Sequence, residues 1–208
     1  MHSTQVNFTS TGNLMDLGEI KIWKFFIQIC LALEVIHDKG IVHADLKPSN
    51  VLMTGRDYDL KLTDFGISQN LSANYNLAHE FIGTLPYCSP EILKGEPYNQ
   101  STDIWALGCI LYELVTRKKA FMSTSEEQLK NVILNFQIPQ LPLQIAPSMA
   151  DLQIIYRMCM QKRQEDRPSV KEILCQQSMI TWAKKLNIFV GIRKIKNFTD
   201  ETLAMLKQ

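Results

Sequence analysis

The 208-residue sequence lacks the features that mark several large classes of protein. No apolar run approaches the roughly 20 residues that a membrane-spanning helix needs. Residues 1–18 lack the basic start and the apolar stretch of a secretory signal. The net charge is only +1, so we expect neither a nucleic-acid partner nor a membrane partner. The composition predicts an ordinary globular protein that is long enough to bury a core.

Cysteine is scarce and irregularly placed: there are five cysteines, an odd number, and no CxxC pair. Three of them, Cys30, Cys109 and Cys159, lie within apolar helical patterns. A core thiol is the favoured interpretation for these three, ahead of a metal ligand. Such usage is typical of a reducing compartment, so we expect a cytoplasmic protein, with the nucleus as the alternative.

Hydrophobic periodicity predicts a mainly helical chain with a few short strands. A largely buried helix is expected over 19–38. Further helices are expected in the second half, over 101–116, 124–135, 148–161 and 168–177. Pro168 would lie in the first turn of the last helix. Short apolar pieces bounded by turn residues predict small strands at 41–42, 51–53 and 60–62. Residues 67–90 show no sustained period and are expected to form a long loop, which in a compact domain is usually functional.

The two ends of the chain show weaker patterns. Residues 1–13 are polar and predict a loop or a frayed end. After Lys185 we expect a tail, with a short helix over 199–206. We therefore divide the chain into segment 1–18, a body over 19–186 and a tail over 187–208.

The segment His43-Ala44-Asp45-Leu46-Lys47-Pro48-Ser49-Asn50 resembles the catalytic loop of eukaryotic serine/threonine protein kinases, and the chemistry of phosphoryl transfer explains its residue types. Asp45 supplies a carboxylate that can orient an attacking hydroxyl and accept its proton. Lys47 supplies a cation for the transferring phosphoryl group, and Asn50 supplies an oxygen of the kind that Mg²⁺ prefers. The alternative is an ordinary polar turn between two strands. The match at six positions favours the chemical interpretation.

Asp64-Phe65-Gly66 resembles the DFG element of the same family, because it follows a predicted strand and comes nineteen residues after Asp45. Gly83-Thr84 and then Ser89-Pro90-Glu91 resemble the end of the activation segment, which would span 64–91. Ser89 stands where this family usually has alanine.

Two further stretches resemble structural parts of the kinase large lobe. Asp103 opens a stretch similar to its central helix, and Asp166-Arg167-Pro168 contains an arginine that would pair with Glu91. The NIMA-related kinases are the most similar subfamily, on the residues Pro97-Tyr98-Asn99, the run from Ser101 to Leu114, and Lys119-Ala120-Phe121.

The resemblance implies a helical kinase-like fold and a set of site residues. It implies that ATP and Mg²⁺ are used and that protein serine or threonine side chains are the acceptors. It assigns catalytic roles to Asp45, Lys47 and Thr84, and metal binding to Asn50 and Asp64. Nucleotide binding would also involve Lys47, with Leu52 beneath the adenine. Structural roles fall to His43, Phe65, Gly66, Glu91, Asp103 and Arg167, with Asp103 capping the catalytic-loop backbone.

Three departures from the family pattern bear on function. No Gly-rich phosphate loop, strand lysine or partner glutamate helix precedes the catalytic loop, so we expect a large C-terminal lobe whose small lobe is encoded upstream or missing. Segment 1–18 would then be the hinge exit and a remnant of the first helix. Ala44 replaces the arginine that usually precedes the catalytic aspartate, and Glu80 stands where a phosphorylatable residue is expected. We therefore expect no dependence on phosphorylation at position 80.

Two functions remain open from the sequence. The first is a protein serine/threonine kinase, which the intact Asp45, Lys47, Asn50 and Asp64 favour. The alternative is a catalytically inactive kinase-like lobe that acts as a protein-binding module. A non-functional gene fragment is the third interpretation.

Overall fold

The computed structural model describes the side chains and backbone of most of the chain, and the backbone alone of strands at 4–5 and 69–70; the fully described residues are 17–54, 59–64, 83–135, 137–141 and 149–190. The helices are α1 (Glu19–His37), α2 (Pro90–Lys94), α3 (Ser101–Thr116), α4 (Glu126–Asn135), α5 (Ala150–Cys159), α6 (Val170–Leu174) and α7 (Gln177–Lys185). Single turns of 3-10 helix are η1 (Pro48–Asn50), η2 (Leu85–Tyr87) and η4 (Gln164–Asp166). The predicted, mainly helical architecture is confirmed.

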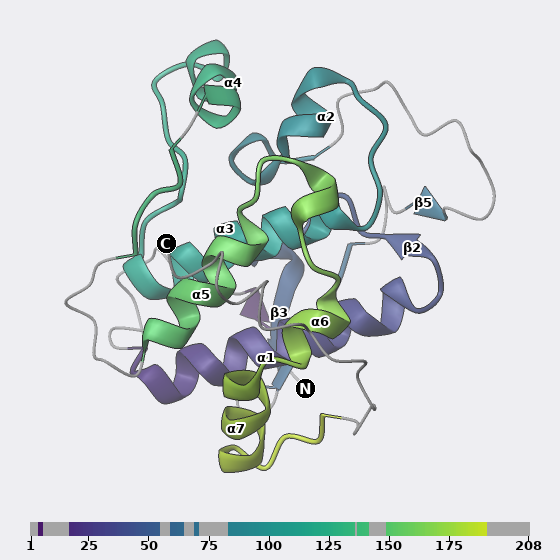
Figure 1. Ribbon diagram of the computed structural model, residues 1–208, viewed down its shortest axis with the longest axis vertical. Coiled ribbons are helices and arrows are strands. Elements are labelled where there is room, and N and C mark those ends of the chain that lie inside the picture. The colour runs from purple at the N-terminus through teal and green to yellow at the C-terminus, as the bar shows by residue number, and fades with distance from the viewer. Residues whose placement is uncertain are drawn as a thin grey trace.

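Helices α1 and α3 form the centre of the molecule. Helix α5 packs on α3, while α6 and α7 pack on α1, so that α7 lies beneath α1 in Figure 1. Two aromatic stacks hold these elements together: Trp23 of α1 stacks on Trp182 of α7, and Trp105 of α3 stacks on Phe121. Trp23 and Trp105 are fully buried, and burial of a side chain of this size stabilises the fold by roughly 3 kcal/mol. Helix α4 projects from the opposite end of the molecule (Figure 1).

A small antiparallel sheet covers one side of α1. Its strand order is β1 (Thr4–Gln5), β3 (Val51–Thr54), β4 (Asp59–Leu62). Gln28 of α1 accepts a hydrogen bond from the backbone of Leu60 through its Oε1, at 2.9 Å, which ties β4 to the helix. A second pair joins β2 (Ile41–Val42) to β5 (Gln69–Asn70). The catalytic-loop segment lies between β2 and β3, and Asp64 follows β4.

Several boundaries differ from the predicted ones. Segment 1–13 contains β1, and the long loop predicted over 67–90 contains β5 and η2 and ends in the first residue of α2. Both strands are two residues long and exist only through pairing with distant strands, which local periodicity does not reveal. The strands predicted near 51 and 60 are present, each slightly longer than expected.

The last predicted helix, 168–177, is shorter than expected, because α6 covers only Val170–Leu174 and a separate helix, α7, begins at Gln177. Helix α6 starts after Ser169, whose side chain accepts from the backbone of Glu172 in a capping box, so Pro168 precedes the cap and does not lie in the first turn. Helix α7 was not predicted. Its apolar positions Met179, Trp182 and Ala183 do recur at helical spacing, so a signal was present. The helix predicted over 199–206 lies outside the described residues.

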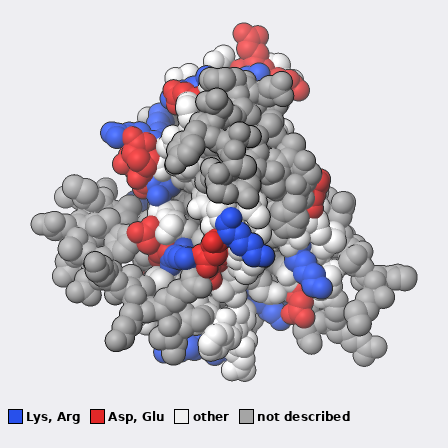
Figure 2. All heavy atoms as spheres, turned by 90° about the vertical axis from the view of Figure 1, so that its right-hand side faces the viewer, with Lys and Arg blue, Asp and Glu red and all other residues white. Residues whose placement is uncertain are grey.

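All five cysteines are free, and Cys30, Cys109 and Cys159 are buried core thiols as predicted. Within the described residues, none of the helices combines the length and the apolar character needed to cross a membrane. Acidic and basic side chains are intermixed on the face that Figure 2 shows. This mixture agrees with the nearly neutral composition.

Candidate active site

The segment between β2 and β3 is held in a strained turn by one buried carboxylate. Ala44 has a φ of 64°, in the left-handed region that alanine rarely occupies. Asp103, in the first turn of α3, accepts hydrogen bonds from the backbone N–H of His43 and of Ala44, each at 2.9 Å. Asp103 is buried, so these bonds replace its contacts with water. The cap that the kinase resemblance implies for Asp103 is thus present.

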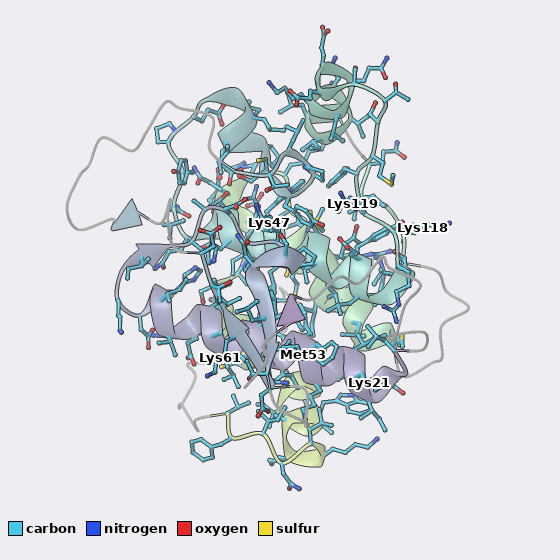
Figure 3. All side chains as sticks on the ribbon, turned by 180° about the vertical axis from the view of Figure 1, so that it is seen from behind. Lys21, Lys47, Met53, Lys61, Lys118 and Lys119 are labelled. Atoms are coloured by element: carbon cyan, nitrogen blue, oxygen red, sulfur yellow. The ribbon has the colours of Figure 1, made fainter. Side chains whose placement is uncertain are left out.

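The strained turn places Asp45 at the centre of a cluster of polar side chains. The Nζ of Lys47 lies 2.6 Å from Oδ2 of Asp45 and donates to Oγ1 of Thr84, also at 2.6 Å. The Thr84 hydroxyl donates in turn to Oδ1 of Asp45 at 2.9 Å. Thr84 is 39 residues away in the chain from Asp45, so only the fold brings these three together. Figure 3 shows Lys47 above the strands that carry Met53 and Lys61.

Asn50 completes the inner side of the cluster. Its Nδ2 donates to the backbone oxygen of Asp45 at 2.8 Å and to the Asp45 carboxylate at 3.1 Å. Because both partners are acceptors, the amide is oriented with its nitrogen towards Asp45 and its oxygen away. That amide oxygen is the atom that a hard cation would bind.

Asp64 lies at the exit of β4 with an exposed side chain and a φ of 62°. The preceding Thr63 anchors this exit, since its backbone N–H donates to the backbone oxygen of Asn50 at 2.9 Å. The imidazole of His43 lies 3.2 Å from the Thr63 oxygen. The two residues expected to bind a metal, Asn50 and Asp64, are therefore held on adjoining segments of backbone.

Gly83 lies close to the catalytic loop in a backbone conformation that other residues rarely adopt. Its φ is 117°, and a Cβ at this position would lie 3.1 Å from the backbone oxygen of Ala44. The glycine therefore lets the segment before Thr84 press against the loop. This contact explains how the Thr84 hydroxyl reaches Asp45.

The comparisons with known proteins decide the family. The model of the family described as the protein kinase domain matches residues 3–179, which is most of the chain. The chain belongs to the protein kinase domain family. It is also similar to individual serine/threonine-protein kinases: Nek1 of Mus musculus is 42% identical over 93% of this chain, and Nek4 of Mus musculus is 39% identical over 79%. Human Nek5 is 41% identical over 76% of the chain. The predicted likeness to NIMA-related kinases is confirmed.

The chain spans only part of these relatives. It covers 15% of the length of Nek1, 20% of Nek4 and 22% of human Nek5. The family model that matches this chain describes the protein kinase domain, so the similarity concerns the kinase fold and its site. The remaining length of those proteins has no counterpart among the matched residues.

The supports that this kinase family implies around the site are also in place. Arg167 and Glu91 form a bidentate pair through Nη1 and Nη2, at 2.6 and 2.8 Å, and both side chains are buried. The guanidinium also donates to the backbone oxygen of Ser101 at 3.1 Å and stacks over the ring of Trp105. A bidentate pair is geometrically specific, so it sets how α2 meets the start of α3.

The structure supplies a reason for the unusual serine at position 89. Its hydroxyl lies 2.6 Å from the hydroxyl of Thr102, and both residues are buried. An alanine would leave the Thr102 hydroxyl without this partner. The departure from the family pattern is therefore compensated within this chain.

Sequence reasoning missed two residues that brace the segment after Thr84. The hydroxyl of Tyr87 donates to Oε2 of Glu113 at 2.6 Å, and both residues are buried. Burial, and then the hydrogen bond to Glu113, raises the pKa of Tyr87 well above its usual value; burial also raises the pKa of Glu113. They are 26 residues apart, and no local pattern links them.

The remaining predicted site residues are placed only in part. Leu52 is half-buried on β3, paired with Lys61 on β4. Phe65, Gly66 and Glu80 lie outside the described residues. Ala44 packs in a small apolar cluster with Val42, Cys88, Ile92 and Tyr98 and brings no charge to the loop. The described residues contain no cluster of three or more His, Cys, Asp or Glu side chains able to hold a metal ion.

Proposed function

We propose that this protein is a serine/threonine protein kinase that transfers the γ-phosphoryl group of ATP to serine or threonine side chains of proteins. The observation that carries the proposal is the contact of Thr84 with both Lys47 and Asp45. The three side chains come from two distant segments, and they form one hydrogen-bonded unit at the catalytic loop. Family membership supports the same reaction.

In this reaction the acceptor hydroxyl attacks the γ-phosphorus of ATP, a new O–P bond forms, and the bond to the leaving ADP breaks. Asp45 orients the hydroxyl and takes up its proton. Lys47 offsets negative charge on the phosphoryl group as it moves, and it is already held beside Asp45. Thr84 borders the place where the acceptor side chain enters, because its hydroxyl bonds to both groups.

The residues present fit a magnesium ion bound together with nucleotide. Mg²⁺ usually takes one or two carboxylates plus phosphate oxygens and waters, so a cluster of three acidic residues is not required. The oriented amide oxygen of Asn50 and the exposed carboxylate of Asp64 would hold it. When bound, the ion would offset the negative charge of the phosphates. Leu52 would lie beneath the adenine.

We also propose that protein substrates are its partners and that it works in the cytoplasm or the nucleus. The five free cysteines support a reducing compartment. The absence of a charge at Ala44 supports the expectation that activity does not require a phosphate on the activation segment. Position 80 lies outside the described residues, so this stays a prediction.

Binding and turnover of nucleotide test the proposal on the 208-residue chain. We expect calorimetry to show Mg²⁺-dependent ATP binding that Asp64→Ala abolishes. Asp59→Ala is the matched control, because it removes an exposed carboxylate from the opposite end of the same strand, β4, and it should leave binding intact.

Transfer of ³²P to a mixed protein substrate should fall by roughly 10²–10⁴-fold in Asp45→Asn. A folded chain without Mg-ATP binding would contradict the proposal. That outcome would favour the alternative, an inactive kinase-like lobe that binds other proteins.

A further inference from the structure

The turn after α3 carries two adjacent lysines that the proposed reaction does not use. Helix α3 ends at Thr116, and Lys118 and Lys119 follow with exposed side chains. In the part of the chain that the structure describes, neither lysine forms an ion pair with an acidic side chain. Two positive charges are therefore available to a partner at this place.

The backbone of this turn is held at both ends. Arg117 has a φ of 63°, and its N–H donates back to a carbonyl of α3 at 2.9 Å. The Thr116 hydroxyl accepts from the backbone N–H of Lys118 at 3.1 Å. On the far side of the lysines, the buried ring of Phe121 stacks on Trp105. The lysines thus extend from a fixed stretch of backbone, and only their side chains need to be ordered when a partner binds.

Lys119 lies close to the segment that follows Thr84. Burial raises the pKa of Glu113, while the hydrogen bond from Tyr87 and the charge of Lys119 act in the opposite direction, so the ammonium group is within electrostatic range of this carboxylate. Tyr87, which donates to Glu113 at 2.6 Å, is the last residue of η2, and η2 begins directly after Thr84. A 3-10 turn advances about 2 Å per residue, so Tyr87 lies roughly 6 Å beyond Thr84. Lys119 is therefore near the place where the acceptor side chain enters.

The acidic side chains at this place are already engaged. Among the described residues of the catalytic loop, of η2 and of the end of α3, the acids are Asp45 and Glu113. Asp45 is paired with Lys47, and Glu113 is 2% exposed and bonded to Tyr87. Figure 3 shows Lys118 and Lys119 in the same part of the view as Lys47. A basic side chain of a substrate would find no exposed acid here, whereas an anionic one would find two lysines.

We propose that Lys118 and Lys119 select protein substrates that carry an anionic side chain, a carboxylate or a phosphate, within about four residues of the acceptor serine or threonine. An extended chain advances about 3.3 Å per residue, so such a side chain can reach the turn while the acceptor lies at Asp45. Complementary charge of this kind contributes specificity more than affinity. This inference names the substrate class of the proposed kinase and rests on that function.

Peptides that differ only in the residues flanking a central serine test the proposal on the 208-residue chain. We expect kcat/KM to be about three- to tenfold higher with Glu flanks than with Gln flanks, and lowest with Lys flanks. Phosphoserine flanks, with nearly twice the charge, should give a larger ratio than Glu flanks and thereby show which anion fits better. Raising the salt to about 1 M, where charges are screened beyond roughly 3 Å, should remove most of the preference.

The variant that decides the assignment is Lys118→Gln/Lys119→Gln, in which the ratio for Glu over Gln flanks should fall to nearly one. The matched control is Lys184→Gln/Lys185→Gln, which removes an adjacent pair of exposed lysines from α7 and should keep the ratio. Equal rates with Glu and Gln flanks in the unchanged chain would overturn the proposal. So would an unchanged ratio in Lys118→Gln/Lys119→Gln, or an equal loss in the control pair, which would show that net charge alone matters.

Binding separates this proposal from the proposed catalysis. Fluorescence anisotropy measures binding of the same peptides with alanine in place of the acceptor serine, so it needs no turnover. The Glu-flanked peptide should bind more tightly than the Gln-flanked one, and Lys118→Gln/Lys119→Gln should abolish the difference. A binding preference without phosphoryl transfer to any peptide would contradict the kinase activity and support the role of the lysines. Phosphoryl transfer without a preference would contradict the role of the lysines alone.

Discussion

Helices α3 and α4 follow one another along the chain but are held in different ways. In α3, twelve of sixteen residues are buried, and they include Thr102, Asp103 and Glu113, each with a hydrogen-bonding partner. In α4, only Leu129 and Ile133 of ten residues are buried. Helix α4 packs along one edge on α2 and η2 and projects away from the body (Figure 1).

The difference shows where the site obtains its rigidity. Three buried polar residues of α3 each contact a segment of the site: Asp103 caps the catalytic loop, Thr102 contacts Ser89, and Glu113 contacts Tyr87. A buried polar group costs free energy unless its partner is in place, so these contacts specify one arrangement. Helix α4 makes no comparable demand within the described residues. We therefore expect changes on α3 to be costly and changes on α4 to be mild.

The largest effect is expected at Arg167, which holds the start of α3. Arg167→Met would leave the buried carboxylate of Glu91 without its partner, and the free energy of unfolding should fall by about 3–5 kcal/mol. Urea denaturation followed by circular dichroism measures this change. Arg163→Met is the control, because its pair with Glu165 is exposed and should contribute nothing measurable. If Arg167→Met were as stable as the unchanged chain, the contrast between the buried and the exposed ion pair would be contradicted.

Substitution to alanine is expected to have a smaller effect, which differs in sign between α3 and α4. It should lower the free energy of unfolding in α3 and raise it in α4. In α3, Gly108→Ala would place a Cβ 2.7 Å from the Sδ of Met160 and 2.9 Å from the Cβ of Cys159. This overpacking should lower the free energy of unfolding by about 1–3 kcal/mol, although alanine favours helix over glycine. In α4, Asn131→Ala is exposed and should raise it by a few tenths of a kcal/mol, or roughly 0.5. Thermal denaturation of both variants gives the signs, and equal signs would contradict the comparison.

Next in size is the buried hydroxyl pair of Ser89 and Thr102. Ser89→Ala should lower the free energy of unfolding by about 1–2 kcal/mol, because it leaves the Thr102 hydroxyl unpaired. The double variant Ser89→Ala/Thr102→Val should recover part of this loss, with a coupling of about 1 kcal/mol in a double-mutant cycle.

The matched change in α4 is Gln128→Ala. It removes exposed bonds from Ser123 and Thr124 and should change stability by less than about 0.5 kcal/mol. In the double-mutant cycle of Ser89 and Thr102, stability changes that simply add would show that the two hydroxyls do not interact.

The smallest effect is expected for thiol chemistry, which leaves the fold intact. Burial raises the pKa of Cys88 to about 12, and burial likewise raises that of Cys109 in α3. At pH 8 roughly one thiol in 10⁴ would be ionised at Cys88. A thiol reagent such as DTNB should therefore react with half-buried Cys175 well before the four buried cysteines. Rapid reaction of Cys109 in the folded chain would show that α3 opens locally.

Much of the helical framework could be predicted from periodicity. The bounds of α3 and the long α1 follow from apolar residues that recur at helical spacing, and the strands β2, β3 and β4 follow from turn residues around short apolar pieces. The short elements were missed, because β1 and β5 hold together only through partners far along the chain. The start of α6 was also predicted wrongly. The capping box of Ser169 begins the helix at Val170, so Pro168 lies before the helix and not in its first turn.

The sequence by itself determined the family, the kinds of side chain at the site and the larger helices. These depend on residue identity and local spacing, which a linear pattern records. The kinase resemblance implied that Asp103 caps the catalytic-loop backbone and that Thr84 acts beside Asp45. Only the tertiary structure supplied the contacts themselves: Thr84 with Asp45, Asp103 with two catalytic-loop amides, and His37 with Asp103. The hydrogen bond of Tyr87 to Glu113 was likewise seen only in the tertiary structure. These contacts join segments from 26 to 66 residues apart, and their geometry depends on how whole helices pack, which local spacing does not encode.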